Sequence, residues 1–180
     1  MGGRDKLMEV VDGQPILRRI ARHCLACGCA TLVTLPQDGP YGPARAAALS
    51  GLPVNLLVVA DAAEGLSASL RAGTTFAEGA DGLMVVMPDM PDIDIADLLL
   101  LRETFAQDRL TPVRATDSGG RLGHPVIIPS RLFSNIAGLR GDHGARALLD
   151  QEKVNLCPLP GLRATTDLDT VGEWSAWRLR

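Results

Sequence analysis

The stretch LMVVMPDMP at residues 83–91 is an apolar run that ends in one carboxylate between two prolines. A near-continuous apolar run of this length predicts a strand over residues 83–87 that is buried on both faces, as in a parallel sheet. Each proline fixes its own φ and restrains the residue before it, so the turn after the strand should be stiff. Ligands of such sheets bind outside the carboxyl ends of the strands. Asp89 is therefore either a carboxylate directed at a ligand or an incidental acid where the next helix begins.

Helix and strand patterns alternate along the rest of the chain. Helices are expected at residues 15–26, 43–49, 66–76, 95–106, 142–150 and 171–177, and strands at residues 30–35, 54–59, 83–87, 110–115, 125–128 and 154–157. This alternation predicts one α/β domain over residues 1–180, built as a three-layer α/β/α sandwich around a mostly parallel sheet.

The composition argues against several classes of protein. Sixteen Arg and two Lys face 21 Asp and Glu, a formal net charge of -3, whereas proteins that bind nucleic-acid backbones usually carry a basic excess. Apolar runs such as residues 56–60 and 98–101 are far shorter than the ~20 residues that cross a bilayer, and the first residues form no apolar signal region. We therefore expect a cytoplasmic protein with no nucleic-acid or membrane partner.

Three of the four cysteines cluster at Cys24, Cys27 and Cys29, and Cys157 is distant in sequence. A tetrahedral metal site needs a fourth ligand at a matching spacing, and His23 is poorly placed because it adjoins Cys24. Small, apolar thiols commonly fill space in cores. We expect these cysteines to pack where a helix ends and a strand begins.

Six short motifs occur in a fixed order. They are MGGRDKL at residues 1–7, GLSASLRAG at 65–73, PDMP at 88–91, GHPV at 123–126, GDHGAR at 141–146 and DLDT at 167–170. Together they resemble the MobA-like NTP transferase domain family, especially its molybdopterin cytidylyltransferase (MocA-like) branch. Members typically read M-G-x-x-K-L, G-[LM]-S-x-S-L-x-x-G, G-D-M-P, G-H-P-V, G-D-x-G-A-R and D-I-D-T-P-E-D. The resemblance implies the Rossmann-like fold of the nucleotide-diphospho-sugar transferases.

The chain also departs from the family pattern. Pro88 replaces a glycine, residues 171–173 read VGE in place of P-E-D, and the chain starts at the M-G that family members place after an apolar strand and an L-A-A-G-x-S-x-R loop. In the family that strand lies between the strands that match residues 31–35 and 83–87. Relative to the family, the domain is thus expected to lack a central strand. We expect unpaired strand edges, and poor stability unless another segment fills the gap.

The resemblance implies transfer of CMP from CTP, or less often of GMP from GTP, to the terminal phosphate of molybdopterin, with release of pyrophosphate. Mg²⁺ suits a reaction between polyanions because it binds one or two protein carboxylates and completes its octahedron with phosphates and waters. Asp89 would supply the first carboxylate, and the pair Asp167 and Asp169 the second, with Asp167 preferred. A molybdoenzyme or its maturation chaperone is a further partner that the resemblance allows.

The same resemblance assigns further roles. Lys6 and Asp89 are the expected catalytic residues; the expected nucleotide-binding residues are Gly2, Gly3, Lys6, Gly65, Ser67, Ser69 and Asp89, and the expected substrate-binding residues are His124, Asp142, Gly144 and Arg146. Each also has a structural interpretation. Lys6 would be a solvated side chain near the terminus, Ser67 a helix N-cap, and His124 a structural hydrogen-bonding residue.

Two other functions stay open. The domain could be a non-catalytic protein that binds or carries the cofactor. It could also keep the chemistry and use another phosphorylated small molecule as acceptor, because a fold does not fix a function.

Overall fold

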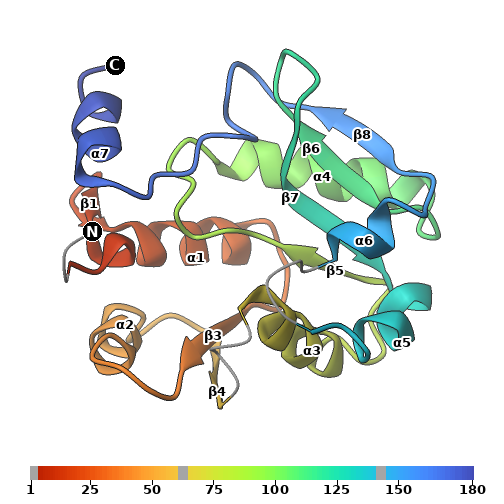
Figure 1. Cartoon of the computed structure of the whole chain (residues 1–180), viewed down its shortest axis with the longest axis horizontal. Coiled ribbons are helices and arrows are strands. Elements are labelled where there is room, and N and C mark those ends of the chain that lie inside the picture. The colour runs from red at the N-terminus through yellow and green to blue at the C-terminus, as the bar shows by residue number, and fades with distance from the viewer. Residues whose placement is uncertain (1–3, 61–64, 141–144) are drawn as a thin grey trace.

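The computed structural model describes residues 4–60, 65–140 and 145–180, in which strands and helices alternate (Figure 1). The strands are β1 (Val10–Val11), β2 (Gln14–Pro15), β3 (Leu32–Pro36), β4 (Asn55–Val59), β5 (Gly82–Val85), β6 (Val113–Thr116), β7 (Leu122–Pro129) and β8 (Asn155–Pro158). The α-helices are α1 (Ile16–Ala26), α2 (Gly42–Ala48), α3 (Leu66–Phe76), α4 (Ile95–Gln107), α5 (Phe133–Ile136), α6 (Arg146–Leu149) and α7 (Val171–Trp177). Short 3-10 helices are η1 (Lys6–Met8) and η3 (Ser130–Leu132).

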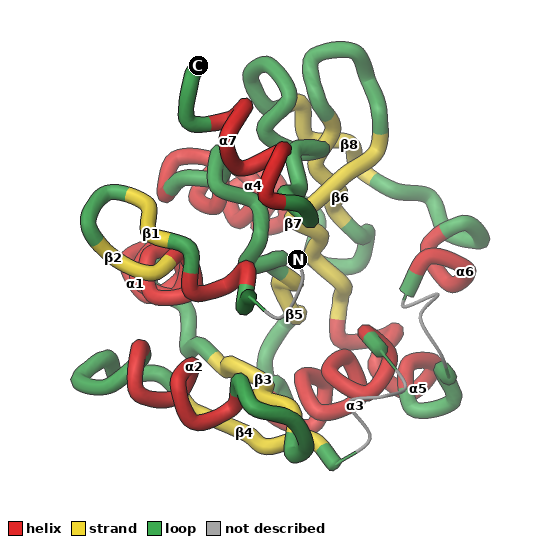
Figure 2. Tube along the Cα trace, turned by 60° about the vertical axis from the view of Figure 1, so that its left-hand side comes forward, coloured by secondary structure: helices red, strands yellow, loops and turns green. Residues whose placement is uncertain are grey.

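The strands pair in mixed directions. One sheet has the order β5-β7-β6-β8, and β1-β2 and β3-β4 form separate two-stranded sheets within the described residues. Strand β7 runs antiparallel to both β5 and β6, whereas β3-β4 and β6-β8 are parallel pairs. The expected single, mostly parallel sheet is therefore wrong for the described chain, although the α/β class is confirmed. Helix α4 packs against β6, β7 and β8, and α3 packs against β3 and β4 (Figure 2).

A tight connection explains why β7 reverses direction. Only five residues separate β6 from β7, which is too short for the crossover that a parallel pair needs. The buried carboxylate of Asp117 organises this turn, because its Oδ1 accepts hydrogen bonds from the backbone N–H groups of Gly119 and Arg121 at 2.9 and 3.0 Å. Gly120 has a φ of +80°, which favours glycine.

Helix α4 shows how local sequence signals set an element. Asp94 and Asp97 form a reciprocal capping box at its start. Leu98, Leu101 and Phe105 follow at spacings of three and four residues, and all three are buried. This face joins α4 to the main core, whose members include residues of α1 and the four-stranded sheet.

Most expected elements are confirmed within a few residues of their limits. The expected strand at 110–115 begins later, at Val113, and the expected helix at 142–150 is described only as α6 (Arg146–Leu149). Helix α5 and the short β1-β2 hairpin were not expected. Within the described ranges no helix is both long and apolar enough to cross a membrane.

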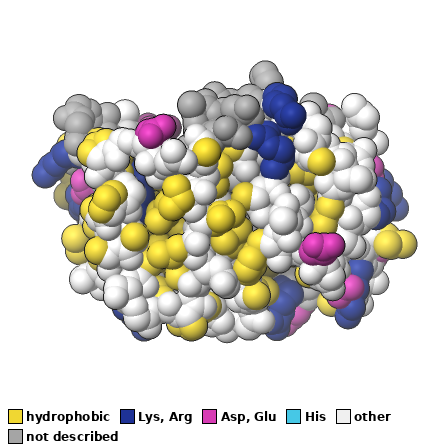
Figure 3. All heavy atoms as spheres, turned by 90° about the horizontal axis from the view of Figure 1, so that it is seen from below, with side chains coloured by type: hydrophobic (Ala, Val, Ile, Leu, Met, Phe, Trp, Pro, Cys, Tyr) yellow, Lys and Arg dark blue, Asp and Glu magenta, His cyan; other side chains and the backbone are white. Residues whose placement is uncertain are grey.

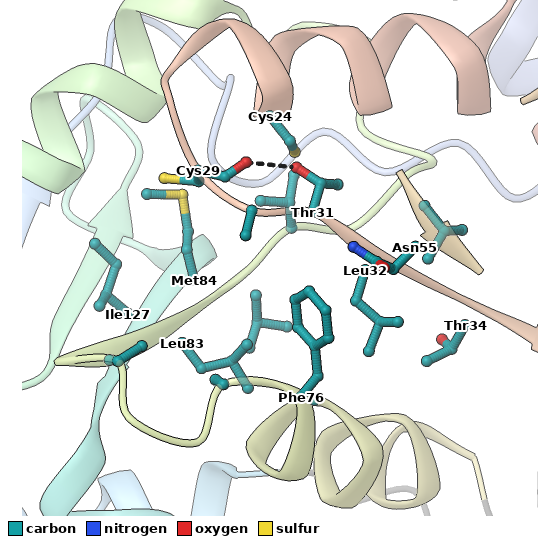
Figure 4. Close-up of a pocket in the computed structure, with 18 of the residues that line it drawn as sticks. Cys24, Cys29, Thr31, Leu32, Thr34, Asn55, Phe76, Leu83, Met84 and Ile127 are labelled. Carbon is teal, nitrogen blue, oxygen red and sulfur yellow. Dashed lines mark hydrogen bonds between the residues drawn. The ribbon is translucent and has the colours of Figure 1, made fainter. Parts of the chain in front are cut away.

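Strands β3 and β5 belong to different sheets and do not pair with each other within the described residues. A cavity of about 830 Å³ lies between them, and we call it the β3–β5 cavity. Its lining includes Leu17, Ile20, Leu32, Phe76, Leu83 and Met84, so it is largely apolar (Figure 4). The expected unpaired strand edges are thus confirmed for the described residues.

The β3-β4 pair also leaves apolar side chains in contact with solvent. Leu56, Leu57 and Val58 of β4 are 44, 41 and 57% exposed. Figure 3 shows hydrophobic side chains spread over the face of the molecule that is seen from below. The small sheet is therefore less well covered than the four-stranded sheet, in which Val126, Ile127 and Ile128 of β7 are buried.

Candidate active site

Lys6 joins two carboxylates that lie far apart in the sequence. Its Nζ donates a hydrogen bond to Oδ2 of Asp89 at 2.6 Å and another to Oδ1 of Asp169. Burial alone would lower the pKa of Lys6, but the hydrogen bonds to Asp169 and Asp89, with the charges of both, raise it above its ordinary value. The ammonium is therefore charged at neutral pH, and it lies between two of the acids that the motifs single out.

An ion pair fixes the segment that carries Lys6. Oδ1 of Asp5 accepts from the backbone N–H of Leu7 at 3.0 Å, and this contact caps η1. The guanidinium of Arg45, in α2, donates to both Asp5 oxygens at 2.8 and 2.9 Å. A two-point contact of this kind fixes the orientation of both side chains and also pairs their charges. Neither residue was predicted from the sequence; an Asp just before a helical turn is the signal that could have identified Asp5.

The loop after β5 and the C-terminal segment lie side by side. The backbone N–H of Leu168 donates to the backbone oxygen of Asp89 at 3.2 Å. Glu173, in the first turn of α7, accepts through Oε2 from the backbone N–H of Asp169 at 2.9 Å. Trp174 is buried in the main core and anchors α7. Two segments far apart in sequence thus present Asp89 and Asp169 to the same lysine.

One oxygen of Asp89 has no partner among the described residues. Oδ1 is buried and accepts no hydrogen bond there, whereas Oδ2 contacts Lys6. A buried carboxylate oxygen without a donor is costly, so it marks a place for a cation or a donor from a ligand. In the described part of the chain, no group of three or more His, Cys, Asp or Glu side chains is arranged so that it could hold a metal ion. Asp89 and Asp169 nevertheless suit a hard cation such as Mg²⁺, which needs few protein oxygens when phosphates supply the others.

A close approach of two backbones sets the position of His124. A Cβ on Gly123 would lie 1.8 Å from the backbone oxygen of Ala164, so only glycine fits there. The backbone N–H of His124 donates to that same oxygen at 2.9 Å. The imidazole is mostly buried and bonds to the backbone of Val85, and its Nδ1 has no partner within the described chain. His124 therefore lies beside the end of β5.

The surroundings of His124 favour its neutral form. Burial lowers the pKa of the imidazole, and the charge of Arg114 lowers it further. The hydrogen bond to Val85 and the charges of Asp89 and Asp167 act in the opposite direction without reversing the shift. The electrostatic influence of both aspartates places His124 in the same group of charges as Lys6.

We expect the pKa of His124 to lie below 6.5 in the folded protein. An unfolded chain binds its proton near 6.5. The free energy of unfolding should therefore fall as the pH drops from about 6.5 through the folded-state pKa, because only the unfolded chain then gains a proton. An NMR titration of the imidazole protons measures the pKa of His124 in the folded protein, and the His124→Gln variant assigns the signal. A midpoint at or above 6.5 would contradict the expectation.

Arg114 and Arg146 bring positive charge to the side of the site that holds His124. Arg114, on β6, donates through Nε to the backbone oxygen of Gly123 at 3.2 Å. Burial lowers the pKa of Arg114, Asp150 opposes this, and the charge of Arg146 at the start of α6 adds to the lowering. The sequence analysis singled out Arg146 and missed Arg114. A charged residue inside an otherwise apolar strand is the signal that could have found it.

The segment that begins with Gly65 lies along the β3–β5 cavity. Gly65, with φ of +70°, is the residue that caps α3, so the interpretation of Ser67 as the N-cap is wrong; Ser67 is buried. Oγ of Ser69 accepts from the hydroxyl of Thr34 at 3.0 Å, and Ser69 lines the cavity. Pro88 lines it too, so the cavity extends to the residue next to Asp89.

Several expected site residues are not placed beside Lys6, Asp89 and Asp169. Gly2, Gly3, Asp142 and Gly144 lie outside the described residues. Asp167 is exposed, and it is Asp169 that shares Lys6 with Asp89. The roles assigned to all these residues stay predictions.

An α/β fold that sets a lysine between two carboxylates, with two arginines nearby, suits a polyanionic phosphate substrate, as in nucleotidyltransferases. Residues 1–156 match the model of the MobA-like NTP transferase domain, and the chain belongs to this family. The family assignment makes nucleotidyl transfer the class of reaction and an NTP the implied substrate.

The chain is also similar in sequence to two named proteins. The chain is 28% identical over 123 residues to the purine catabolism protein PucB of Bacillus subtilis (strain 168), a match that covers 65% of this chain and 56% of PucB. It is 25% identical over 178 residues to the nicotine blue oxidoreductase of Paenarthrobacter nicotinovorans, which covers 95% of this chain and 86% of that protein. These matches support the family and leave the substrate open.

Solved structures share the fold. A crystal structure of Rv0371c from Mycobacterium tuberculosis H37Rv superposes with a TM-score of 0.81 at 22% identity, over 99% of this chain and 91% of that one. A complex of Rv0371c with manganese gives 0.75 at 22% identity, over 95% and 89%. A CMP-2-keto-3-deoxy-manno-octonic acid synthetase complexed with CTP gives 0.70 at 12% identity, over 97% and 90%. At these identities the likeness establishes the fold alone.

Proposed function

We propose that this protein transfers CMP from CTP to the terminal phosphate of molybdopterin and releases pyrophosphate. The observation that carries the proposal is the position of Lys6 between Asp89 and Asp169, beside the unpartnered buried oxygen of Asp89. The family supports the NTP, and the motif resemblance supports both cytidine and the molybdopterin acceptor. The names of the two relatives do not mention molybdopterin, and a different phosphorylated acceptor is the alternative.

The chemistry needs alignment and counter-charge. A phosphate oxygen of the acceptor attacks the α-phosphorus of the NTP, a new P–O bond forms, and the bond to the β-phosphate breaks with its electron pair leaving on pyrophosphate. Lys6 would hold the phosphates and offset the negative charge that develops on the leaving group. Asp89 and Asp169 would hold Mg²⁺, which when bound supplies further charge neutralisation at the phosphates.

The opposite side of the site fits the acceptor. Arg114 carries a permanent positive charge next to His124, and the charge of Arg146 acts on Arg114. Guanidinium groups bind phosphates through paired hydrogen bonds, so these two would hold the terminal phosphate of the acceptor. Neutral His124 uses its one N–H in the bond to the backbone of Val85, so its Nδ1 could accept a hydrogen bond from a donor group of the acceptor without adding charge.

Calorimetric titration with CTP, GTP and Mg²⁺ tests the nucleotide and metal parts of the proposal. We expect CTP to bind when Mg²⁺ is present, and Asp89→Asn to weaken this binding at least tenfold because it removes a charge from the cation site. Asp81→Asn is the matched control, since Asp81 is exposed and pairs only with Arg109 among the described residues. Absence of heat with every nucleotide would refute the proposal.

The carrier function is the second candidate, and the open β3–β5 cavity beside Pro88 favours it. A domain with an unfilled cavity that extends to the residue next to Asp89 could keep ligand binding and lose turnover. Pyrophosphate release in the presence of molybdopterin separates the two functions. Binding of CTP or molybdopterin with no pyrophosphate release identifies a carrier.

A further inference from the structure

Three cysteines, one in the last turn of α1 and two in the connection between α1 and β3, take no part in the proposed transfer. Cys27 is buried, and its Sγ lies 3.6 Å from the Sγ of Cys29. Gly28, between them, has a φ of +76°, so the chain turns sharply at this point. The packing expected for these residues is confirmed for Cys27, which belongs to the main core; Cys24 and Cys29 are only packed against it. The sequence pattern did not predict that the thiols of Cys27 and Cys29 would be in contact.

A guanidinium from another helix stabilises negative charge at this pair. Arg102, on α4, donates through Nη1 to the backbone oxygen of Cys27. A Cβ on Gly28 would lie 3.2 Å from the same Nη1, so the guanidinium lies directly against the turn. The hydrogen bond from Cys27 lowers the pKa of the Cys29 thiol to about 6, and the charge of Arg102 adds to the lowering against the effect of burial.

The pKa values of the other three thiols are raised instead of lowered. The hydrogen bond to Cys29, with burial, raises the pKa of Cys27. Burial raises the pKa of Cys24 to about 11 and also raises the pKa of Cys157. The pair therefore combines one thiolate with one protonated neighbour, an arrangement that favours thiol exchange chemistry.

The thiolate is also reachable. Cys29 is half-buried and lines the β3–β5 cavity, where it lies next to Met84 (Figure 4). The hydroxyl of Thr31 donates to the backbone oxygen of Cys29 at 3.0 Å and holds the start of β3 in place. Both cysteines line the cavity, and Cys29 is the less buried of the two.

We propose that Cys27 and Cys29 form a redox-active dithiol that reacts with small hydroperoxides. The Cys29 thiolate attacks the terminal peroxide oxygen; an S–O bond forms, the O–O bond breaks, and the other oxygen leaves as an alcohol or water after taking a proton. Cys27 then attacks the resulting sulfenic sulfur, an S–S bond forms, the S–O bond breaks, and water leaves. Two electrons pass from the two thiols to the peroxide. The sulfurs need to close from 3.6 Å to the ~2.05 Å of a disulfide.

The first experiment measures thiolate reactivity by alkylation with iodoacetamide and peptide mapping. Cys29 should react about tenfold faster than Cys157 at pH 7, with a half-maximal rate near pH 6. Arg102→Gln should move this midpoint upward, because it removes the neighbouring positive charge. Equal rates for Cys29 and Cys157 in the intact protein would overturn the proposal.

The second experiment treats the protein with hydrogen peroxide and measures the mass of the peptide that contains the cysteines. We expect the loss of two hydrogens, reversed by dithiothreitol, in the original chain and in Cys24→Ala. Cys29→Ala should abolish the loss, and Cys27→Ser should accumulate a sulfenic acid on Cys29 that dimedone traps. Circular dichroism confirms that each variant is folded. A disulfide that survives Cys27→Ser, or no mass change in the original chain, would refute the assignment.

Discussion

Replacing Lys6 with Met is expected to lower the rate of nucleotidyl transfer by about 100- to 1,000-fold, the range found when one preorganised donor to a developing negative charge is removed. The ammonium of Lys6 is held by Asp89 and Asp169, so it is already in position before a phosphate arrives. The measurement is pyrophosphate release with saturating CTP, Mg²⁺ and molybdopterin, followed by the same assay over a range of CTP concentrations.

Lys153→Met is the matched control, because Lys153 is the other lysine of the sequence and is exposed. It should keep activity within about twofold of the original chain, as expected for an exposed site away from the reaction. The double variant Lys6→Met with Asp89→Asn should lose much less than the product of the two single losses, since both residues act on the same phosphates. Activity of Lys6→Met near that of the Lys153→Met control would exclude a catalytic role for Lys6.

Filling the β3–β5 cavity with a strand is expected to raise the melting temperature by about 5 °C or more, equivalent to about 2 kcal/mol for a chain of this size. The chain would be extended before Met1 by an apolar strand of about six residues, followed by the L-A-A-G-x-S-x-R loop. Such a strand could pair with the free edges of β3 and β5 and bury its side chains against Leu32 and Leu83. Differential scanning calorimetry measures the shift.

Two extended chains of equal length are the controls. One carries Ser at the apolar positions, and the other carries a Pro in the middle of the strand, which cannot donate to a neighbouring strand. Neither should raise the melting temperature as the apolar strand does. An equal rise with the Ser control would show that the gain does not come from burial, and no rise with the apolar strand would mean that the cavity does not accept one.

Local patterns predicted most of the secondary structure. Patterns of apolar residues placed α3 at Leu66–Phe76 and α7 at Val171–Trp177 with the limits that the structure has. These signals depend on neighbours within one or two turns, which a sequence displays directly. The reversal of β7 was missed because it depends on how few residues separate it from β6 and on the turn that Asp117 builds.

The candidate site was predicted in part for the same reason. The motifs identified Lys6, Asp89 and Asp169, which the fold brings together, with His124 close by, but they favoured Asp167, which the fold does not place at Lys6. They did not reveal Arg114, nor the pair of Asp5 and Arg45 that holds Lys6 in place. A supporting residue is recognised by what it touches, and such contacts join segments that are distant in the sequence.

The amino-acid sequence by itself determined the α/β class, the limits of most elements and the family, because periodicity, capping and motif order are local properties of the chain. Only the tertiary structure decided that Asp169 shares Lys6 with Asp89, that β7 runs antiparallel to β5 and β6, and that Cys27 and Cys29 are in contact. Each of these depends on the directions in which packed elements present their side chains and edges, and packing between distant segments is set by the whole fold.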